Sequence, residues 1–220
     1  YHYPVNESSV PWVGAPEVWD TYGATGEGIS IAVIDTGIDY THANFGGPGT
    51  VEAYDNNDPE VIEAGTFPTA KVIGGFDFAG PIYNPCAEPP IEPADPDPDP
   101  LDGNGHGSHV AGKAAGLGVT VNSGVEIGPG TAPDASLYAL KVFNDTSGCT
   151  NLTSDAIEWA LDPNGDGSTD DHVDVINMSL GSDFGSPEDP SAVASQNAVE
   201  MGVVVVAAAG NAGPAHYVVG

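Results

Sequence analysis

Five apolar runs, rich in valine and isoleucine, limit the possible folds of this 220-residue chain more than any other feature. They do not alternate polar with apolar residues, as a strand with one solvated face does, so each is expected to form a strand buried on both faces. Helical segments separate several of the runs, and such alternation is typical of a parallel sheet covered by helices. The expected strands are Ile29–Asp35, Lys71–Phe76, Ser136–Phe143, Val173–Met178 and Val203–Ala208.

The helical segments complete the prediction of a three-layer α/β fold, in which a mainly parallel sheet carries helices on both faces. The last helix has the clearest boundaries, because Asp189 can cap its start, Pro190 suits the first helical position and Gly202 follows its end. Functional side chains in such sheets gather at the carboxyl ends of the strands. The expected helices are Gly107–Leu117, Ser154–Leu161 and Ser191–Met201.

Two segments lack this alternation. Residues 1–28 have little periodicity and are expected to form an extended arm with one short helix, Ala15–Tyr22. Residues 80–102 are a Pro/Asp-rich insertion, and the proline density between Cys86 and Leu101 blocks helices and strand ladders alike. We expect a stiff, exposed, polyproline-like loop there. A solvated loop is favoured over the alternative, in which its carboxylates bind calcium.

The charge balance excludes one class of partner. The chain has 32 acidic residues against three basic ones, all lysine, whereas nucleic acid is bound by clustered lysine and arginine, so no nucleic-acid partner is expected. The acidity favours a soluble, salt-tolerant secreted surface, with a preference for basic substrates as the alternative. No apolar run is long enough for a membrane helix, so no membrane contact is expected, and the size suits one domain, 1–220.

Cys86 and Cys149 are the two cysteines of the chain. In a secreted protein such a pair favours one disulfide, and two separate thiols are the alternative because spacing alone does not decide. On the chain-entropy model the closed loop would stabilise the fold by roughly 4 kcal/mol.

Asp35, His106 and Asn211 are the candidate catalytic residues. Asp35 ends the first expected strand, where a carboxylate can fix the tautomer of an imidazole and stabilise its protonated form. His106 stands between Gly105 and Gly107 at the start of a helix of small residues, and imidazole titrates near neutral pH, as a general base must. Asn211 follows the last expected strand, where its amide can donate to a developing oxyanion; a turn asparagine is the alternative.

Four motifs, in this order, resemble those of the subtilisin-like serine proteases, the subtilases. They are Asp35-Thr-Gly, His106-Gly-Ser-His-Val-Ala-Gly, Asn177-Met-Ser-Leu-Gly-Ser and Gly210-Asn-Ala-Gly-Pro. The resemblance implies a subtilisin-like fold and a secreted, extracellular serine endopeptidase that hydrolyses peptide or protein substrates. In such an enzyme, the resemblance implies that Asp35 orients the imidazole, His106 transfers the proton and Asn211 holds the oxyanion.

The resemblance also implies a substrate cleft with two walls. One wall would pair with an extended peptide as an added strand. The other would leave a roomy apolar primary pocket, because its residues are two alanines and a glycine. The first wall is Ser179, Leu180 and Gly181, and the second is Ala208, Ala209 and Gly210.

The nucleophile of the family, in a Gly-Thr-Ser-Met-Ala string, does not occur in residues 1–220. Ser179 is not a substitute, because Asn177 replaces the first glycine of a Gly-x-Ser-x-Gly elbow. We therefore interpret the chain as the N-terminal portion of a subtilisin-like catalytic domain, truncated before the serine helix. The remainder of the domain would supply the serine, and these 220 residues alone are expected to be inactive. The acidic loop and the Asn-Ala-Gly-Pro string of this chain are most similar to those of the large multidomain subtilases. Members of that subgroup often carry a protease-associated insert between the oxyanion asparagine and the serine.

Residues 162–174 predict a structural Ca²⁺ site. Oxygen-bearing side chains at positions one, three and five, followed by glycine at position six, match an EF-hand-like loop, although position twelve is Val173 where that motif has glutamate. An acidic surface turn is the alternative. The alternative function for the whole chain is a calcium-binding pseudoprotease or a peptide-binding module that keeps the substrate cleft but lacks the nucleophile. The expected ligands are Asp162, Asn164, Asp166, Ser168 through its carbonyl, and Asp170.

Overall fold

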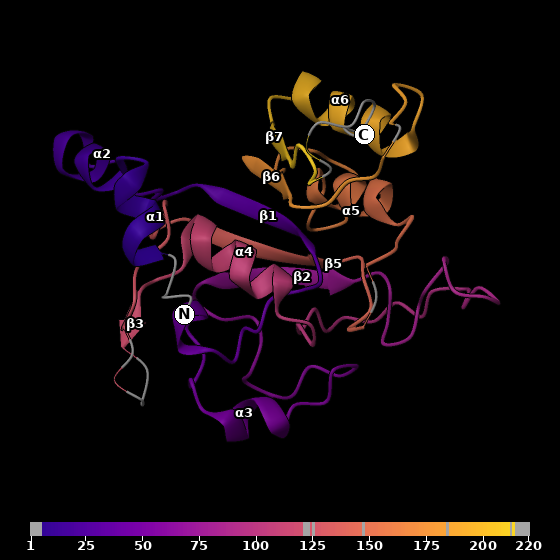
Figure 1. Ribbon diagram of the computed structural model, residues 1–220, viewed down its shortest axis with the longest axis horizontal. Helices are drawn as coiled ribbons and strands as arrows, with labels where there is room; N and C mark the ends of the chain where they lie inside the picture. The colour runs from indigo at the N-terminus through magenta and orange to yellow at the C-terminus, as the bar shows by residue number, and fades with distance from the viewer. Residues whose placement is uncertain are drawn as a thin grey trace.

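A five-stranded parallel sheet forms the centre of the computed structural model, which describes residues 6–120, 124, 126–146, 148–183, 185–211 and 213 (Figure 1). Its strand order is β2-β5-β1-β6-β7, and every neighbouring pair is parallel. All five expected strands are present, and none of their ends is shifted by more than two residues. They are β1 (Ser30–Asp35), β2 (Val72–Asp77), β5 (Ser136–Lys141), β6 (Val175–Met178) and β7 (Val204–Ala207).

Helices cover both faces of the sheet, which confirms the three-layer α/β prediction. Alternate residues of β1 enter two separate hydrophobic clusters, with Ala32 and Ile34 in one and Ile31 and Val33 in the other. The burial of both faces explains why the β1 sequence does not alternate polar and apolar residues. The prediction of two buried faces is wrong for the edge strand β7, where Val204 is 57% and Val206 is 47% exposed. The first cluster includes residues of α5 (Thr153–Ala160) and α6 (Pro190–Glu200), and the second includes residues of α4 (His106–Ala115), which crosses the sheet in Figure 1.

The N-terminal segment differs from the extended arm expected for residues 1–28. Helix α2 lies at the expected place, Ala15–Tyr22, but residues 6–12 form a further helix, α1 (Asn6–Trp12), so the prediction of an extended chain is wrong there. Tertiary contacts hold α1, because Val10 is buried and the Asn6 side-chain amide donates to the carbonyls of Gly112 and Gly128 at 2.8 and 3.1 Å. A sequence pattern does not reveal such contacts.

Several short elements were also not expected from the sequence. None is long enough to show an apolar period. One of them, α3, begins after Thr50, whose side chain accepts a hydrogen bond from the backbone N–H of Ala53. They are the 3₁₀ helix η1 (Ala43–Phe45), α3 (Val51–Asp55), and the antiparallel pair β3 (Val119–Thr120) and β4 (Glu126–Ile127).

The Pro/Asp-rich insertion is exposed in its middle but anchored at both ends. Tyr83 is buried near its start, an isolated antiparallel bridge joins Asp97 to Asp77 at the end of β2, and Asp99 is fully buried. The Asn84–Ile91 bridge joins two residues of the insertion to each other. The expected exposed loop is therefore present only between these anchors. The Cys86–Cys149 disulfide, predicted as the favoured alternative, ties the segment to the chain that follows β5.

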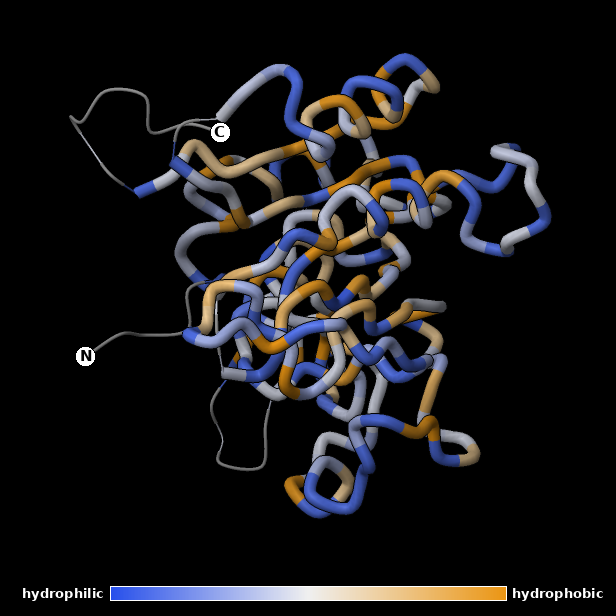
Figure 2. Tube along the Cα trace, turned by 90° about the vertical axis from the view of Figure 1, so that its right-hand side faces the viewer, coloured by the Kyte–Doolittle hydropathy of each residue, from blue (hydrophilic) through white to orange (hydrophobic). Residues whose placement is uncertain are grey.

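Hydrophobic residues concentrate in the strands and helices of the body, whereas the loops that project from it are mostly hydrophilic (Figure 2). Among the described residues, no helix combines the length and the apolar character needed to cross a membrane.

Candidate active site

Asp35 and His106 meet at the carboxyl edge of the sheet. Asp35 is the last residue of β1 and its side chain is 1% exposed, whereas His106 is the first residue of α4 and its side chain is 54% exposed. His106 Nδ1 lies 2.7 Å from Asp35 Oδ1. Because an ionised carboxylate only accepts hydrogen bonds, this contact places the imidazole proton on Nδ1. Among the described residues none hydrogen-bonds to the second ring nitrogen, Nε2.

Two glycines allow the start of α4 to reach the loop that follows β1. A Cβ atom at Gly107 would lie 2.1 Å from the carbonyl oxygen of Gly37 and 3.2 Å from Asp35 Cβ, so only glycine permits this approach. Gly105 has open space around it, but its φ of +97° favours glycine for conformational reasons. The glycine after His106 therefore leaves room for the loop that follows Asp35.

The electrostatics of Asp35 reflect its burial. Burial raises the pKa of the Asp35 carboxyl above its ordinary value, while the hydrogen bonds from His106 and from the Thr36 N–H act in the opposite direction. Asp35 Oδ1 accepts both of these bonds, at 2.7 and 2.8 Å. The hydrogen bond from the imidazole is the largest of the interactions that favour the charged carboxylate, which is the form that orients a catalytic imidazole.

The predicted substrate-binding and oxyanion residues follow the carboxyl ends of β6 and β7, at the same edge of the sheet as Asp35. β6 and β7 are paired up to Met178 and Ala207, and Ala208 N–H donates to the Met178 carbonyl at 3.0 Å, so the two predicted substrate walls leave the sheet side by side. Asn211 is exposed, and in the described part of the chain no hydrogen bond joins it to His106. Ser179 and Leu180 are half-buried, whereas Gly181, Ala208, Ala209 and Gly210 are exposed.

The predicted calcium loop is exposed and folds onto its own backbone. Asp162 accepts hydrogen bonds from the N–H groups of Asp166 and Gly167, at 3.1 and 2.8 Å, and Asn164 Oδ1 also accepts from Asp166 N–H. The oxygens of the first and third loop positions therefore converge on one N–H group. Asp166 itself accepts from Ser168 N–H, and Asp170 is exposed. Within the described residues no three His, Cys, Asp or Glu side chains gather as a metal-holding group.

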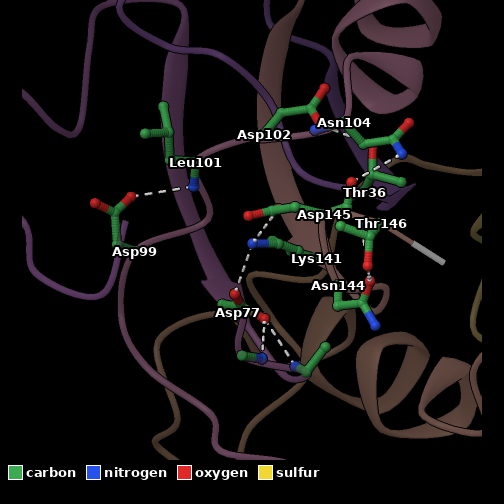
Figure 3. Close-up of polar contacts among 12 residues, drawn as sticks. Thr36, Asp77, Asp99, Leu101, Asp102, Asn104, Lys141, Asn144, Asp145 and Thr146 are labelled. Carbon is green, nitrogen blue, oxygen red and sulfur yellow. Dashed lines mark hydrogen bonds and ion pairs between the residues drawn. The ribbon is translucent and has the colours of Figure 1, made fainter. Parts of the chain in front are cut away.

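A buried ionic cluster that the sequence did not reveal lies behind the site (Figure 3). The Lys141 side chain, 1% exposed, contacts Asp77 Oδ2 and Asp145 Oδ1, each at 3.0 Å. Burial alone would lower the pKa of Lys141, but the two carboxylates raise it above its ordinary value. A lysine inside an expected buried strand was a usable signal, because a buried lysine requires charged partners.

Asp97 and Asp99 extend this acidic region toward the end of the Pro/Asp-rich insertion. Burial raises the pKa of each carboxyl to about 6. Hydrogen bonds act in the opposite direction: Asp97 accepts one from Asp99 N–H. Asp99 accepts from the Tyr40 hydroxyl and from Leu101 N–H. Asp99 is fully buried, and the Tyr40 hydroxyl donates to its carboxylate at 2.7 Å.

Comparisons with known proteins agree with this geometry. The model of the subtilase family matches residues 26–220. Minor extracellular protease Vpr of Bacillus subtilis is 32% identical over 222 residues, which cover 99% of this chain and 22% of that protein. Subtilisin DY of Bacillus licheniformis is 36% identical over 206 residues, which cover 93% of this chain and 54% of that protein.

Solved structures give the same result. A protease of Pseudoalteromonas arctica superposes with a TM-score of 0.58 at 27% identity, over 90% of this chain and 53% of that one. Fervidolysin of Fervidobacterium pennivorans, a keratinolytic enzyme related to subtilisin, superposes with a TM-score of 0.52 at 26% identity, over 89% of this chain and 23% of that one. The chain thus spans about half of the length of subtilisin DY and of the Pseudoalteromonas protease.

Substitution of Gly107 by alanine tests the close approach. We expect Gly107→Ala to lower the free energy of unfolding by roughly 2 to 3 kcal/mol, because the new methyl group overlaps the Gly37 carbonyl. Gly148→Ala is the matched control, since no atom lies within 4 Å of the added group, and it should change stability by less than about 0.5 kcal/mol. Equal effects of the two substitutions in urea unfolding would contradict the packing described here.

Asp99→Asn tests the buried acidic region through pH. A carboxyl whose pKa is raised in the folded protein stabilises it below the unfolded value near 3.8 and loses that contribution as pH rises through about 6. Wild-type stability should therefore fall between about pH 4 and 6, and Asp99→Asn should reduce the slope by up to about 1.4 kcal/mol per pH unit. The exposed control Asp20→Asn removes the same charge and should leave the slope unchanged. Identical slopes for both variants would show that Asp99 titrates as it does in the unfolded chain.

Proposed function

Because this chain belongs to the subtilase family, we propose that it supplies the His–Asp half of the active site of a secreted serine endopeptidase. The observation that carries the proposal is the 2.7 Å contact between His106 Nδ1 and the buried Asp35 carboxylate at the carboxyl edge of the sheet. That contact leaves Nε2 on the exposed side of the molecule, where it can accept a proton from a nucleophile.

In the proposed mechanism, His106 moves one proton twice. A serine from outside residues 1–220 attacks the scissile carbonyl while Nε2 takes its hydroxyl proton, and Nε2 later gives that proton to the leaving amine. Asp35 holds the Nδ1 proton throughout and stabilises the imidazolium that forms. The Asn211 amide would donate to the developing oxyanion from the end of β7. Subtilisin is itself the measured example of this effect, and loss of its asparagine donor costs about 10² to 10³ in kcat.

The two segments beyond β6 and β7 would bind the substrate. Ser179, Leu180 and Gly181 follow β6 and would pair with an extended peptide, since no side chain at Gly181 obstructs the backbone. Ala208, Ala209 and Gly210 follow β7 and would form the opposite wall of a pocket that tolerates large uncharged side chains. The parallel pairing of β6 with β7 supports this arrangement by starting both segments at the same level.

Two observations support secretion. The structure contains a Cys86–Cys149 disulfide, and disulfides persist mainly in oxidising compartments. The relative Vpr is described as an extracellular protease, and it aligns with nearly the whole of this chain.

We also propose that residues 162–174 bind Ca²⁺ as a structural ion. The donors are oxygen atoms, which suit a hard cation, and five carboxylates within thirteen residues repel one another without one. The converging Asp162 and Asn164 oxygens and the buried, unpartnered Asp171 Oδ1 support a cation in this loop. Asp162, Asn164, Asp166, Asp170 and the Ser168 carbonyl would hold it, and the ion would take no part in peptide hydrolysis.

An organophosphorus reagent directed at activated serines tests the endopeptidase proposal. In the longest form that the gene encodes, we expect stoichiometric labelling of one serine outside residues 1–220, and His106→Ala should slow labelling by a factor of about 10⁴ or more. Residues 1–220 alone should remain unlabelled, and Ser179→Ala should leave labelling of the long form intact. A labelled serine within residues 1–220 would overturn the proposal. Peptide binding without any labelling would favour a calcium-binding pseudoprotease or peptide-binding module.

Calcium removal tests the second proposal. Chelation should lower the melting temperature, because a ligand at about 100 times its Kd stabilises the folded state by about 2.7 kcal/mol. Asp166→Asn should remove most of this calcium dependence, whereas Asp183→Asn, an exposed residue outside the loop, should preserve it. An unchanged melting temperature after chelation would show that the loop is an acidic surface turn.

A further inference from the structure

Asp102 has the most complete set of hydrogen bonds of any carboxylate near the candidate site. It is 3% exposed, and both of its oxygens accept bonds only from N–H and O–H groups. Oδ1 accepts from Thr36 Oγ1 at 2.9 Å, Asn104 N–H at 2.9 Å and Gly105 N–H at 2.8 Å. Oδ2 accepts from the N–H and the hydroxyl of Ser108, at 2.8 and 2.6 Å.

These donors surround the Asp35–His106 pair on both sides. Thr36 follows Asp35 directly, Gly105 precedes His106, and Ser108 lies in the first turn of α4. One carboxylate therefore joins the loop after β1, the turn before α4 and the helix itself, and Figure 3 shows the Thr36, Asp102 and Asn104 side chains gathered at this point.

Two further bonds make the connection continuous. The Thr36 hydroxyl, which donates to Asp102, also accepts from Gly107 N–H at 2.9 Å. The Ser108 hydroxyl, which likewise donates to Asp102, also accepts from Asp39 N–H at 2.8 Å. Both hydroxyl groups thus have a single orientation, and each bridges the β1 loop and α4.

The exposure of His106 makes this connection important for its orientation. With 54% of its side chain exposed, the imidazole depends for its position mainly on the backbone of α4 and on the bond to Asp35. The first turn of a helix has free N–H groups, and Gly105, the N-cap residue, has no side chain to satisfy them. Asp102 accepts from two of the N–H groups at this end, those of Gly105 and Ser108, and the Thr36 hydroxyl that donates to Asp102 accepts from a third, that of Gly107.

We propose that Asp102 is a positioning residue that sets the distance between the His106 imidazole and the Asp35 carboxylate by fixing α4 against the β1 loop. It touches neither the imidazole nor any reacting atom. Its effect on catalysis rests on the proposed function. In an enzyme, a misplacement of a catalytic group by about 1 Å can cost on the order of 10² in rate. Its effect on the His106–Asp35 contact does not require that function.

Asp102→Asn and Thr36→Val test this role. The first substitution would turn an amide NH₂ group toward donors. The second would remove both bonds of the Thr36 hydroxyl, the one to Asp102 and the one from Gly107 N–H, with little change of volume. We expect both variants to shift the His106 Nδ1–H proton resonance and to speed its exchange with solvent, with the resonance assigned by its loss in His106→Ala. In the longest encoded form, kcat for a peptide substrate should fall by about 10 to 100 times, with KM within a factor of about two.

Asp189→Ala is the matched control, because Asp189 caps α6 through Ser191 N–H at 2.9 Å and has no hydrogen bond to the site. It should lower stability without moving the His106 resonance or kcat. If Asp102→Asn and Thr36→Val behave like Asp189→Ala, Asp102 is only a helix cap and the proposal is wrong. If Asp102→Asn does not fold, Thr36→Val decides. If the variants shift the His106 resonance but the long form has no peptidase activity, the positioning role stands and the proposed function is wrong. If the long form is an active peptidase and the variants leave kcat unchanged, the proposed function stands and the positioning role is wrong.

Discussion

The contact between the start of α4 and the loop after β1 is the constraint on which the candidate site depends. Gly107 meets the Gly37 carbonyl so closely that no side chain fits between them. This approach places His106 on the Asp35 carboxylate, although the two residues are 71 positions apart in the chain. The parallel sheet supplies the other half of the geometry, because it ends β1, β6 and β7 at one edge.

Acidic side chains far outnumber basic ones, and two of the three lysines are buried inside the protein. Lys71 and Lys141 are both buried, the first donating to the carbonyl of Pro133 at 2.7 Å and the second paired with Asp77 and Asp145. The carboxylates behind the site are therefore held in three different ways: by a lysine, by the Tyr40 hydroxyl in the case of Asp99, and by five N–H and O–H donors in the case of Asp102.

The sequence predicts the elements whose signals are local, and it misses those that depend on distant contacts. Apolar runs indicated all five strands, and the glycines around His106 identified the imidazole and its helix. Helix α1 was missed because Asn6 is held by carbonyls more than a hundred residues away. Asp102 stands within the same motif as His106, but its role depends on Thr36, 66 residues earlier, which no spacing rule connects to it. The functions of Asn211 and of the 162–174 loop remain predictions.

The tautomer of neutral His106 tests the central claim most directly, because the proposed chemistry needs the proton on Nδ1 and a free lone pair on Nε2. A two-dimensional ¹H–¹⁵N spectrum of the imidazole groups reports it. We expect the Nδ1–H tautomer in the wild-type chain and its loss in Asp35→Ala. A predominant Nε2–H tautomer, unchanged in Asp35→Ala, would contradict it.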